Sequence, residues 1–110
     1  MRFIFASALV ATLLLPALAL AADSGCFQRT AHAWGGHCDD QKSLELTHLN
    51  SCSYAATLVV CFEQAGGQWD CKHQEYVQPN RSATLWSCGN TGNFKIEACN
   101  RTEECTLIPR

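Results

Sequence analysis

No two cysteines of this chain stand close together in the sequence. Its 110 residues include eight cysteines, separated by 11, 13, 8, 9, 16, 10 and 5 residues, so adjacent cysteines, Cys-x-Cys and Cys-x-x-Cys are all missing. Structural zinc sites and thioredoxin-like redox centres are built on such close pairs. We therefore expect neither a cysteine metal site nor a redox motif, and the sequence indicates no cofactor.

The chain also lacks an apolar run of the roughly 20 residues that a membrane span requires. Its longest apolar stretch covers residues 3–15, follows Arg2 and precedes Ala19-Leu20-Ala21. A basic start, a short apolar stretch and a small-x-small ending are typical of a secretory signal peptide. The sequence predicts a signal peptide over 1–21, one secreted or periplasmic domain over 22–110, and no membrane span.

Positive charge is not in excess. Eight Lys and Arg stand against ten Asp and Glu, for a formal net charge of −2 at pH 7. Such a balance does not attract a polyanion, so nucleic acid is not an expected partner. No Gly-x-Ser-x-Gly motif marks a serine nucleophile either.

Cysteine itself is abundant. In an oxidising compartment eight cysteines are expected to form four disulfides. Each disulfide adds roughly 2–4 kcal/mol, mainly by restricting the unfolded chain. Four are comparable with the whole net stability of a small domain. The composition therefore predicts a cysteine-rich domain that depends on its disulfides.

Helical periodicity is missing, whereas short segments with period-two or β-branched character recur between turn residues. The expected strands are 44–49 (a short helix is the alternative there), 56–62, 68–77, 82–88 and 94–99. Segment 56–62 is apolar on both faces and should be the central strand. We predict an all-β fold: a small disulfide-stapled antiparallel meander, as a sandwich or a partly closed barrel, with a loop-rich N-terminal segment over 22–43.

The strongest turn signal is Gly66-Gly67, which predicts a hairpin. A two-residue turn places Cys61 opposite position 72, whereas a small bulge or a three-residue loop places it opposite Cys71. We therefore predict a Cys61–Cys71 disulfide across this hairpin.

A second hairpin is less secure. A turn at Gly92-Asn93 places Cys88 opposite Glu97, two residues short of Cys99. Cys88–Cys99 is accordingly the less secure of the two predicted pairs. The partners of four other cysteines stay open: Cys26, Cys38, Cys52 and Cys105.

Histidines are the only groups expected to titrate near neutral pH without a large perturbation. His32 and His37 stand near Asp39 and Asp40, which suits a metal site, an acid–base pair, or a polar surface loop tied down by its disulfide. Neither histidine has the helical spacing of a metal motif. The polar surface loop is the favoured interpretation, and no metal site is predicted.

A second histidine set is the basis for an enzyme alternative. His48, His73, Glu75 and Arg81 are the types of residue that a small secreted hydrolase or nuclease uses. Their spacing follows no catalytic motif, so no catalytic residue is predicted.

Large aromatics are the main candidates for binding, since tryptophan and tyrosine are favoured at interfaces. Trp69 follows the tight turn and either projects toward a partner or folds back over the Cys61–Cys71 disulfide as core. Trp86 belongs to a strand with an apolar face, and we expect it to be covered. The predicted binding residues are Trp69, Gly66, Gly67 and Trp34.

These features favour a non-enzymatic extracytoplasmic binding module, such as an inhibitor, an immunity-type protein or an effector. Its expected partner is another extracytoplasmic protein. A rigid, stapled scaffold lowers the entropy cost of binding. The alternatives are the small hydrolase or nuclease that uses histidines, and a structural component of an envelope.

Overall fold

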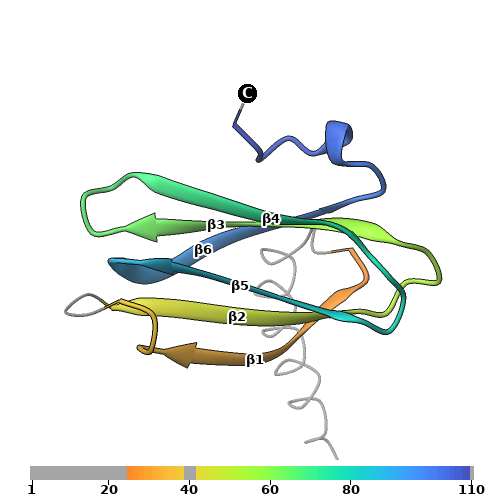
Figure 1. Ribbon diagram of the computed structural model, residues 1–110. Helices are drawn as coiled ribbons and strands as arrows, with labels where there is room; N and C mark the ends of the chain where they lie inside the picture. Colours follow the sequence, from red (N-terminus) through yellow and green to blue (C-terminus); the bar gives the residue numbers. More distant parts are fainter. Residues whose placement is uncertain (1–24, 39–41, 110) are drawn as a thin grey trace, which may run out of the picture.

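A computed structural model describes residues 25–38 and 42–109 and shows two antiparallel sheets packed face to face (Figure 1). The predicted signal peptide lies outside the described residues. The elements are β1 (Phe27–Trp34), β2 (Ser43–Asn50), β3 (Ala56–Gln64), β4 (Trp69–Val77), β5 (Ser82–Cys88), β6 (Asn90–Cys99) and the one-turn 3-10 helix η1 (Thr102–Glu104). No helix in this part of the chain has the length and apolar character needed to cross a membrane.

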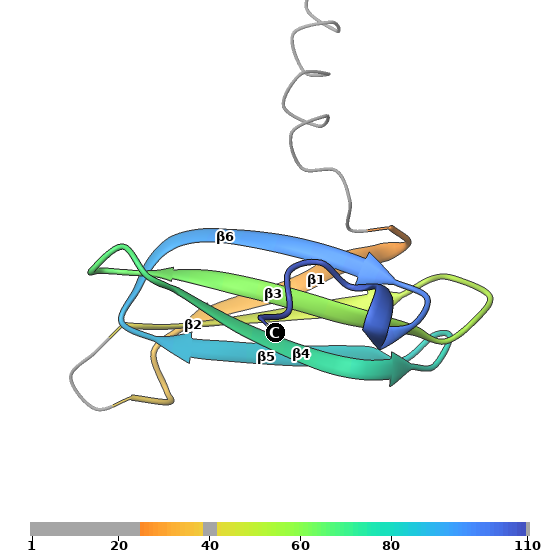
Figure 2. The same ribbon diagram turned by 90° about the horizontal axis from the view of Figure 1, so that it is seen from above.

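Each sheet has three strands. Sheet A has the order β1-β2-β5 and sheet B the order β4-β3-β6, so the chain changes sheets after β2, after β4 and after β5. The strands of the two sheets cross at an angle when seen from above (Figure 2). The predicted all-β antiparallel fold is confirmed, in the form of a sandwich.

Part of the segment predicted to be loop-rich is a strand. β1 pairs antiparallel with β2, with one irregularity between Arg29 and Ala31. Only Phe27 of its eight residues is buried. Because β1 has no apolar face, periodicity does not reveal it; backbone pairing with β2 and the Cys26–Cys52 disulfide hold it in place.

The inner faces of the two sheets form the core. β2 alternates as expected for a strand, with Leu44, Leu46 and His48 buried and Glu45 and Thr47 half-buried. The apolar core comes from both sheets and includes Phe27, Leu44, Leu46, Ala83 and Leu85 of sheet A, and Ala56, Leu58, Val60, Phe62 and Val77 of sheet B.

β3 is buried on both faces, as its apolar sequence predicted. Sheet A covers one face, and the C-terminal segment, which lies over sheet B in Figure 1, covers the other. There Val59 and Cys61 form a second cluster with Cys105. The Glu97 carboxylate accepts hydrogen bonds of 2.8–2.9 Å from the backbone N–H groups of the C-terminal segment at residues 106 and 107, which ties this segment to β6.

The β3–β4 hairpin has the geometry that its glycines indicate. The Gln64 N–H donates to the Gln68 carbonyl at 2.8 Å, which leaves a three-residue loop in which Gly67 has a φ of 94°. This loop places Cys61 directly opposite Cys71, and the two form a disulfide.

The predicted Cys88–Cys99 pair does not form. Cys88 is bonded to Cys38, and Cys99 is bonded to Cys105. β5 and β6 make no hairpin, because the chain crosses from sheet A to sheet B at Gly89, and β6 pairs with β3 instead. The four intramolecular disulfides are typical of an oxidising, extracytoplasmic environment.

Candidate functional site

All three tryptophans lie at the same end of the sandwich. Trp34 ends β1, Trp69 begins β4 and Trp86 comes near the end of β5, so all three are at the left-hand end in Figure 1, beside the β3–β4 turn. Their exposed fractions are 49%, 39% and 40%. We call these three residues with the turn at 65–68 the tryptophan end. The predicted binding residues Trp34, Gly66, Gly67 and Trp69 all belong to it.

Trp86 was expected to be covered, and that expectation was wrong. Along β5 the buried residues are Ala83, Leu85 and Ser87, whereas Thr84 and Trp86 are exposed. The apolar face of the strand therefore consists of the residues on either side of Trp86, and the tryptophan points outward from sheet A.

The three rings face different directions. Trp69 lies over the outer face of sheet B, with the Lys95 ammonium 4.3 Å from its ring centre. Trp86 lies on the outer face of sheet A, stacked on the His37 ring with centres 4.1 Å apart. Trp34 lies at the edge between β1 and β6, against Gly92. The tryptophans therefore surround this end on three sides and do not form one flat platform.

Two of the four disulfides brace this end. Cys61–Cys71 closes the hairpin two residues from Trp69. Cys38–Cys88 joins β5, two residues beyond Trp86, to the residue next to His37. The His37 imidazole also contacts the Glu45 carboxylate at 2.6 Å. Both the backbone and the stacking partner of Trp86 are therefore held.

A small polar network surrounds Trp69. The Glu63 carboxylate, opposite Trp69 in the hairpin, accepts 2.8 Å hydrogen bonds from Asn93 and Thr91. The hydrogen bond from Asn93, followed by that from Thr91, lowers the pKa of Glu63. The tryptophan therefore has an anionic Glu63 beside it and the cationic Lys95 against its ring.

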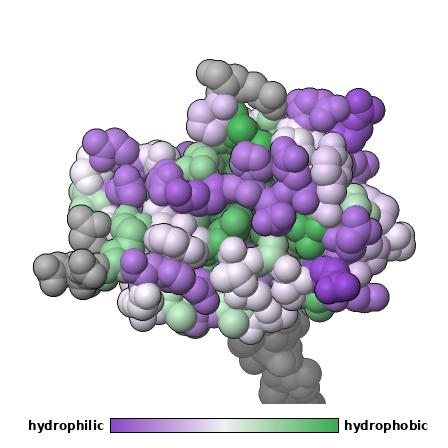
Figure 3. All heavy atoms as spheres, in the orientation of Figure 1, coloured by the Kyte–Doolittle hydropathy of each residue, from purple (hydrophilic) through white to green (hydrophobic). Residues whose placement is uncertain are grey.

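A groove separates β4 from β5, the edge strands of the two sheets on one side of the sandwich. Two hollows of about 450 and 430 Å³ lie along it. In Figure 3, hydrophobic side chains are visible between the hydrophilic ones of the upper layer and the paler ones of the lower layer. The first hollow is lined by Cys71, Lys72, His73, Thr84, Leu85 and Trp86. The second is lined by 74–78 and 81–84. We call this feature the edge groove.

Polar contacts join the groove's two walls at the tryptophan end. The Ser87 hydroxyl of β5 donates to the Asp70 carboxylate of β4 at 2.6 Å. The Lys72 ammonium lies 3.5 Å from the same carboxylate, and His73 lies 3.7 Å from Glu75 along β4. The ammonium of Lys72 is thus paired with the Asp70 carboxylate within β4.

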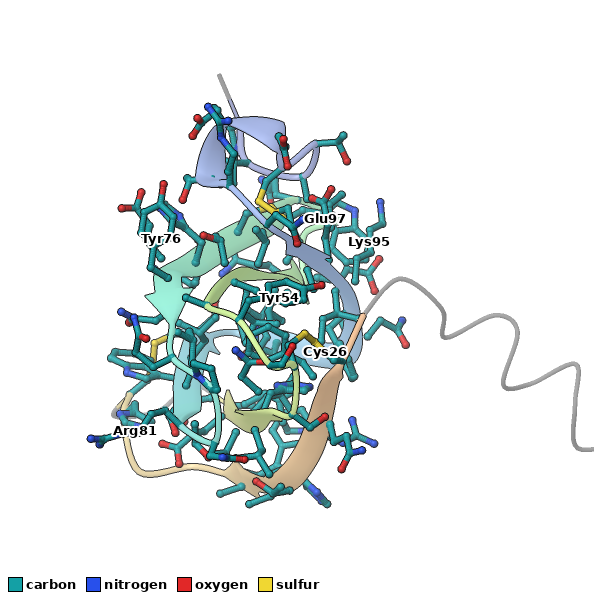
Figure 4. The ribbon with its side chains drawn as sticks, turned by 90° about the vertical axis from the view of Figure 1, so that its right-hand side faces the viewer. Cys26, Tyr54, Tyr76, Arg81, Lys95 and Glu97 are labelled. Atoms are coloured by element: carbon teal, nitrogen blue, oxygen red, sulfur yellow. A yellow bond between two sulfur atoms is a disulfide. The ribbon has the colours of Figure 1, made fainter. Side chains whose placement is uncertain are left out.

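Tyr76 occupies a strained position that nothing in the sequence indicates. A bulge sets Glu75 and Tyr76 of β4 against the single residue Thr57 of β3, and Tyr76 has a φ of 49°. Its N–H donates to the Thr57 hydroxyl at 3.3 Å, which helps to hold this conformation. Tyr76 is 48% exposed, at the end of the sandwich that faces the viewer in Figure 4, where Tyr54 and Arg81 also lie.

The histidine set considered for catalysis does not assemble. His48 is 3% exposed between the sheets, and burial, followed by the charge of Arg29, lowers its pKa to about 4. His73 and Glu75 lie on the exposed strand β4. His48 therefore has no access to a substrate shared with them.

The N-terminal histidines are not brought together either. His32 lies exposed on β1, whereas His37 is used in stacking and in its contact with Glu45. Asp39 and Asp40, the carboxylates considered with them, lie outside the described residues.

One group of potential metal ligands comes together in the described part of the chain: Glu97, Cys99 and Cys105. The two cysteines are bonded to each other, so they supply no thiolate. The Glu97 carboxylate is engaged by the C-terminal segment. This group serves structure.

Comparisons with protein-family models, with curated proteins and with solved structures found no match. The function is therefore inferred from the surface of the domain. Two features distinguish that surface: the braced tryptophan end and the edge groove, which meet at Trp86.

Proposed function

We propose that this protein is a non-enzymatic extracytoplasmic binding module that acts through contact with another protein, and that the tryptophan end is its main contact surface. The observation that carries the proposal is the exposure of all three tryptophans at one disulfide-braced end. Tryptophan is among the residues enriched in interface hot spots, where removal of one side chain costs about 2 kcal/mol or more of binding free energy.

The distribution of aromatics supports this role. Phe27 and Phe62 are buried, and Phe94 packs against the same core. Among the described residues the phenylalanines are therefore buried or half-buried, whereas the tryptophans are exposed. Tryptophan suits an interface because it combines a large apolar area with an N–H donor.

The brace supports the role as well. Ordering a flexible side chain on binding costs roughly 0.5–1.5 kcal/mol, and a preorganised surface avoids part of this cost. Secretion, through removal of the predicted signal peptide over 1–21, would place this surface where an extracytoplasmic partner is available. Four disulfides are consistent with such a compartment.

A capture experiment tests the proposal. The purified oxidised protein is immobilised, proteins from the extracytoplasmic fraction of its source cells are bound, and captured proteins are identified after crosslinking. Trp69→Ala and Trp86→Ala should each weaken capture of the same protein at least tenfold. Each variant should still give the near-UV circular dichroism spectrum of a folded domain.

The opposite end of the sandwich offers a matched control. Tyr54 is 50% exposed, as much as the tryptophans, and lines neither hollow of the edge groove. Tyr54→Ala should leave capture within about threefold of the unmodified protein. The proposal is wrong if nothing is captured, if the tryptophan variants bind as well as the unmodified protein, or if only the tyrosine variant loses binding.

A further inference from the structure

β5 leaves one of its two edges unpaired among the described strands, since it pairs only with β2. The Asn50 N–H donates to the Arg81 carbonyl at 2.9 Å, and the register of β2 with β5 continues from there without irregularity. Hydrogen-bonding direction alternates along an antiparallel strand. Ala83 and Leu85 therefore direct their backbone groups to β2, and Thr84 and Trp86 direct theirs to the free edge.

This edge lacks the features that protect strand edges from pairing. Its sequence, Ser-Ala-Thr-Leu-Trp-Ser-Cys, contains no charge, no proline and no glycine, and its register has no bulge. The other edge strands carry charges: Arg29 on β1, Lys72 among others on β4, and Lys95 on β6. Charges and bulges discourage the addition of a strand, so β5 is the edge most open to it.

The two hollows of the edge groove lie next to each other along β5. Thr84, Leu85 and Trp86 line the first, and residues 81–84 line the second, so the two hollows meet at Thr84. The residues of an added strand that lie opposite Leu85 and Ala83 point to the same face of sheet A as these two residues, toward the groove. They are two positions apart, as alternate side chains of a strand are.

We infer that the free edge of β5 binds an extended segment of the partner protein as an added strand, which deepens the proposed function and rests on it. The segment's main chain bonds to the N–H and C=O groups of Thr84 and Trp86, and two of its alternate side chains enter the hollows. Main-chain bonding supplies affinity in such complexes and the side-chain pockets supply selectivity.

The linings indicate which side chains fit. Leu85 and Trp86 line the first hollow together with Lys72 and His73. Tyr76 and Val77 line the second together with Gln74, Glu75 and Arg81. Both linings mix apolar and polar groups, so the partner segment is an extended stretch whose side chains at positions i and i+2 combine an apolar part with a polar group.

A selection with a displayed library of random ten-residue peptides tests the inference. Peptides are selected on the oxidised protein and measured against Thr84→Pro and Thr84→Val. Both variants lose the 2.9 Å contact between the Thr84 and Thr47 hydroxyls, but only the proline removes the edge N–H. Selected peptides should bind Thr84→Pro at least tenfold more weakly, and Thr84→Val within about threefold of the unmodified protein.

Amide hydrogen exchange supplies a measurement that does not depend on the proline variant folding. In the unmodified protein without peptide, the Ala83 and Leu85 amides should exchange slowly and those of Thr84 and Trp86 fast. A bound peptide should slow exchange at Thr84 and Trp86 at least tenfold.

Three results would overturn the inference. The first is that no peptide is selected. The second is that Thr84→Pro and Thr84→Val lose the same peptide affinity and that bound peptide leaves amide exchange at Thr84 unchanged. The third is self-association of the protein in sedimentation that Thr84→Pro abolishes, which would make a second copy the occupant. If Thr84→Pro captures the natural partner normally while Trp69→Ala does not, the proposed function stands and only the edge inference fails.

Discussion

Lowering the pH from 7 to 4 should destabilise the folded domain through His48. This side chain is 3% exposed in the core, and in the sheet it lies between Arg29 of β1 and Ala83 of β5. Its Nδ1 atom is buried without a hydrogen-bond partner among the described residues. Burial, and then the nearby positive charge of Arg29, lowers the pKa of His48 from 6.5 to about 4.

The direction of the effect follows from proton binding. Between pH 6.5 and 4 His48 is protonated in the unfolded chain but not in the folded domain. The unfolded state therefore binds more protons, and it is stabilised relative to the folded state as the pH falls. The stabilisation is complete above the unfolded pKa, is lost progressively toward pH 4, and changes no further below it. At 1.36 kcal/mol per pKa unit, the loss attributable to His48 is about 3 kcal/mol.

Urea unfolding of the oxidised protein at pH 7, 6, 5 and 4 measures this loss. His48→Gln carries no titrating group, so its free energy of unfolding should fall less than that of the unmodified protein, by about 3 kcal/mol over this range. Carboxylates titrate in both proteins and cancel in the comparison. His73→Gln leaves His48 in place and should keep the loss attributable to His48. Equal losses in the His48→Gln variant and the unmodified protein would refute the reasoning.

Two further predictions concern stability. Trp69→Ala should lower the free energy of unfolding less than Phe62→Ala does, because Trp69 is 39% exposed whereas Phe62 is fully buried and its truncation should cost about 3–5 kcal/mol. Comparable losses in urea titrations would show that Trp69 contributes to the core. Asn50→Ala should cost about 2–4 kcal/mol, since this fully buried amide bonds to the Val77 and Tyr54 carbonyls and to the Cys52 N–H, and a loss below 1 kcal/mol in thermal unfolding would contradict that role.

Local patterns in the sequence were sufficient for several features. The β-branched, apolar segment at 56–62 identified the central strand, because a short run rich in β-branched residues and apolar on both faces is typical of a strand covered on both faces. The Gly66-Gly67 turn located the hairpin and, through it, the Cys61–Cys71 disulfide, because a short turn determines which residues face each other. These are interactions between residues close in sequence.

Pairings between distant residues needed the tertiary structure. The Cys38–Cys88 disulfide spans 50 residues, and it depends on the return of β5 to pair with β2. The same return places His48 in the core and removes it from any catalytic set. No local pattern predicts it, because the segment between residues 89 and 93 is compatible with either a turn or a crossing between sheets.

The candidate binding surfaces divide in the same way. The sequence by itself indicated that Trp69 comes directly after a tight turn and that Trp34 is a candidate for binding. Both predictions rest on local composition. The gathering of three tryptophans at one end, the outward direction of Trp86 and the free edge of β5 were decided by strand order and register. A one-residue change of register would turn Trp86 inward and Leu85 outward, because successive side chains of a strand point to opposite faces and only packing between the sheets selects which face is buried.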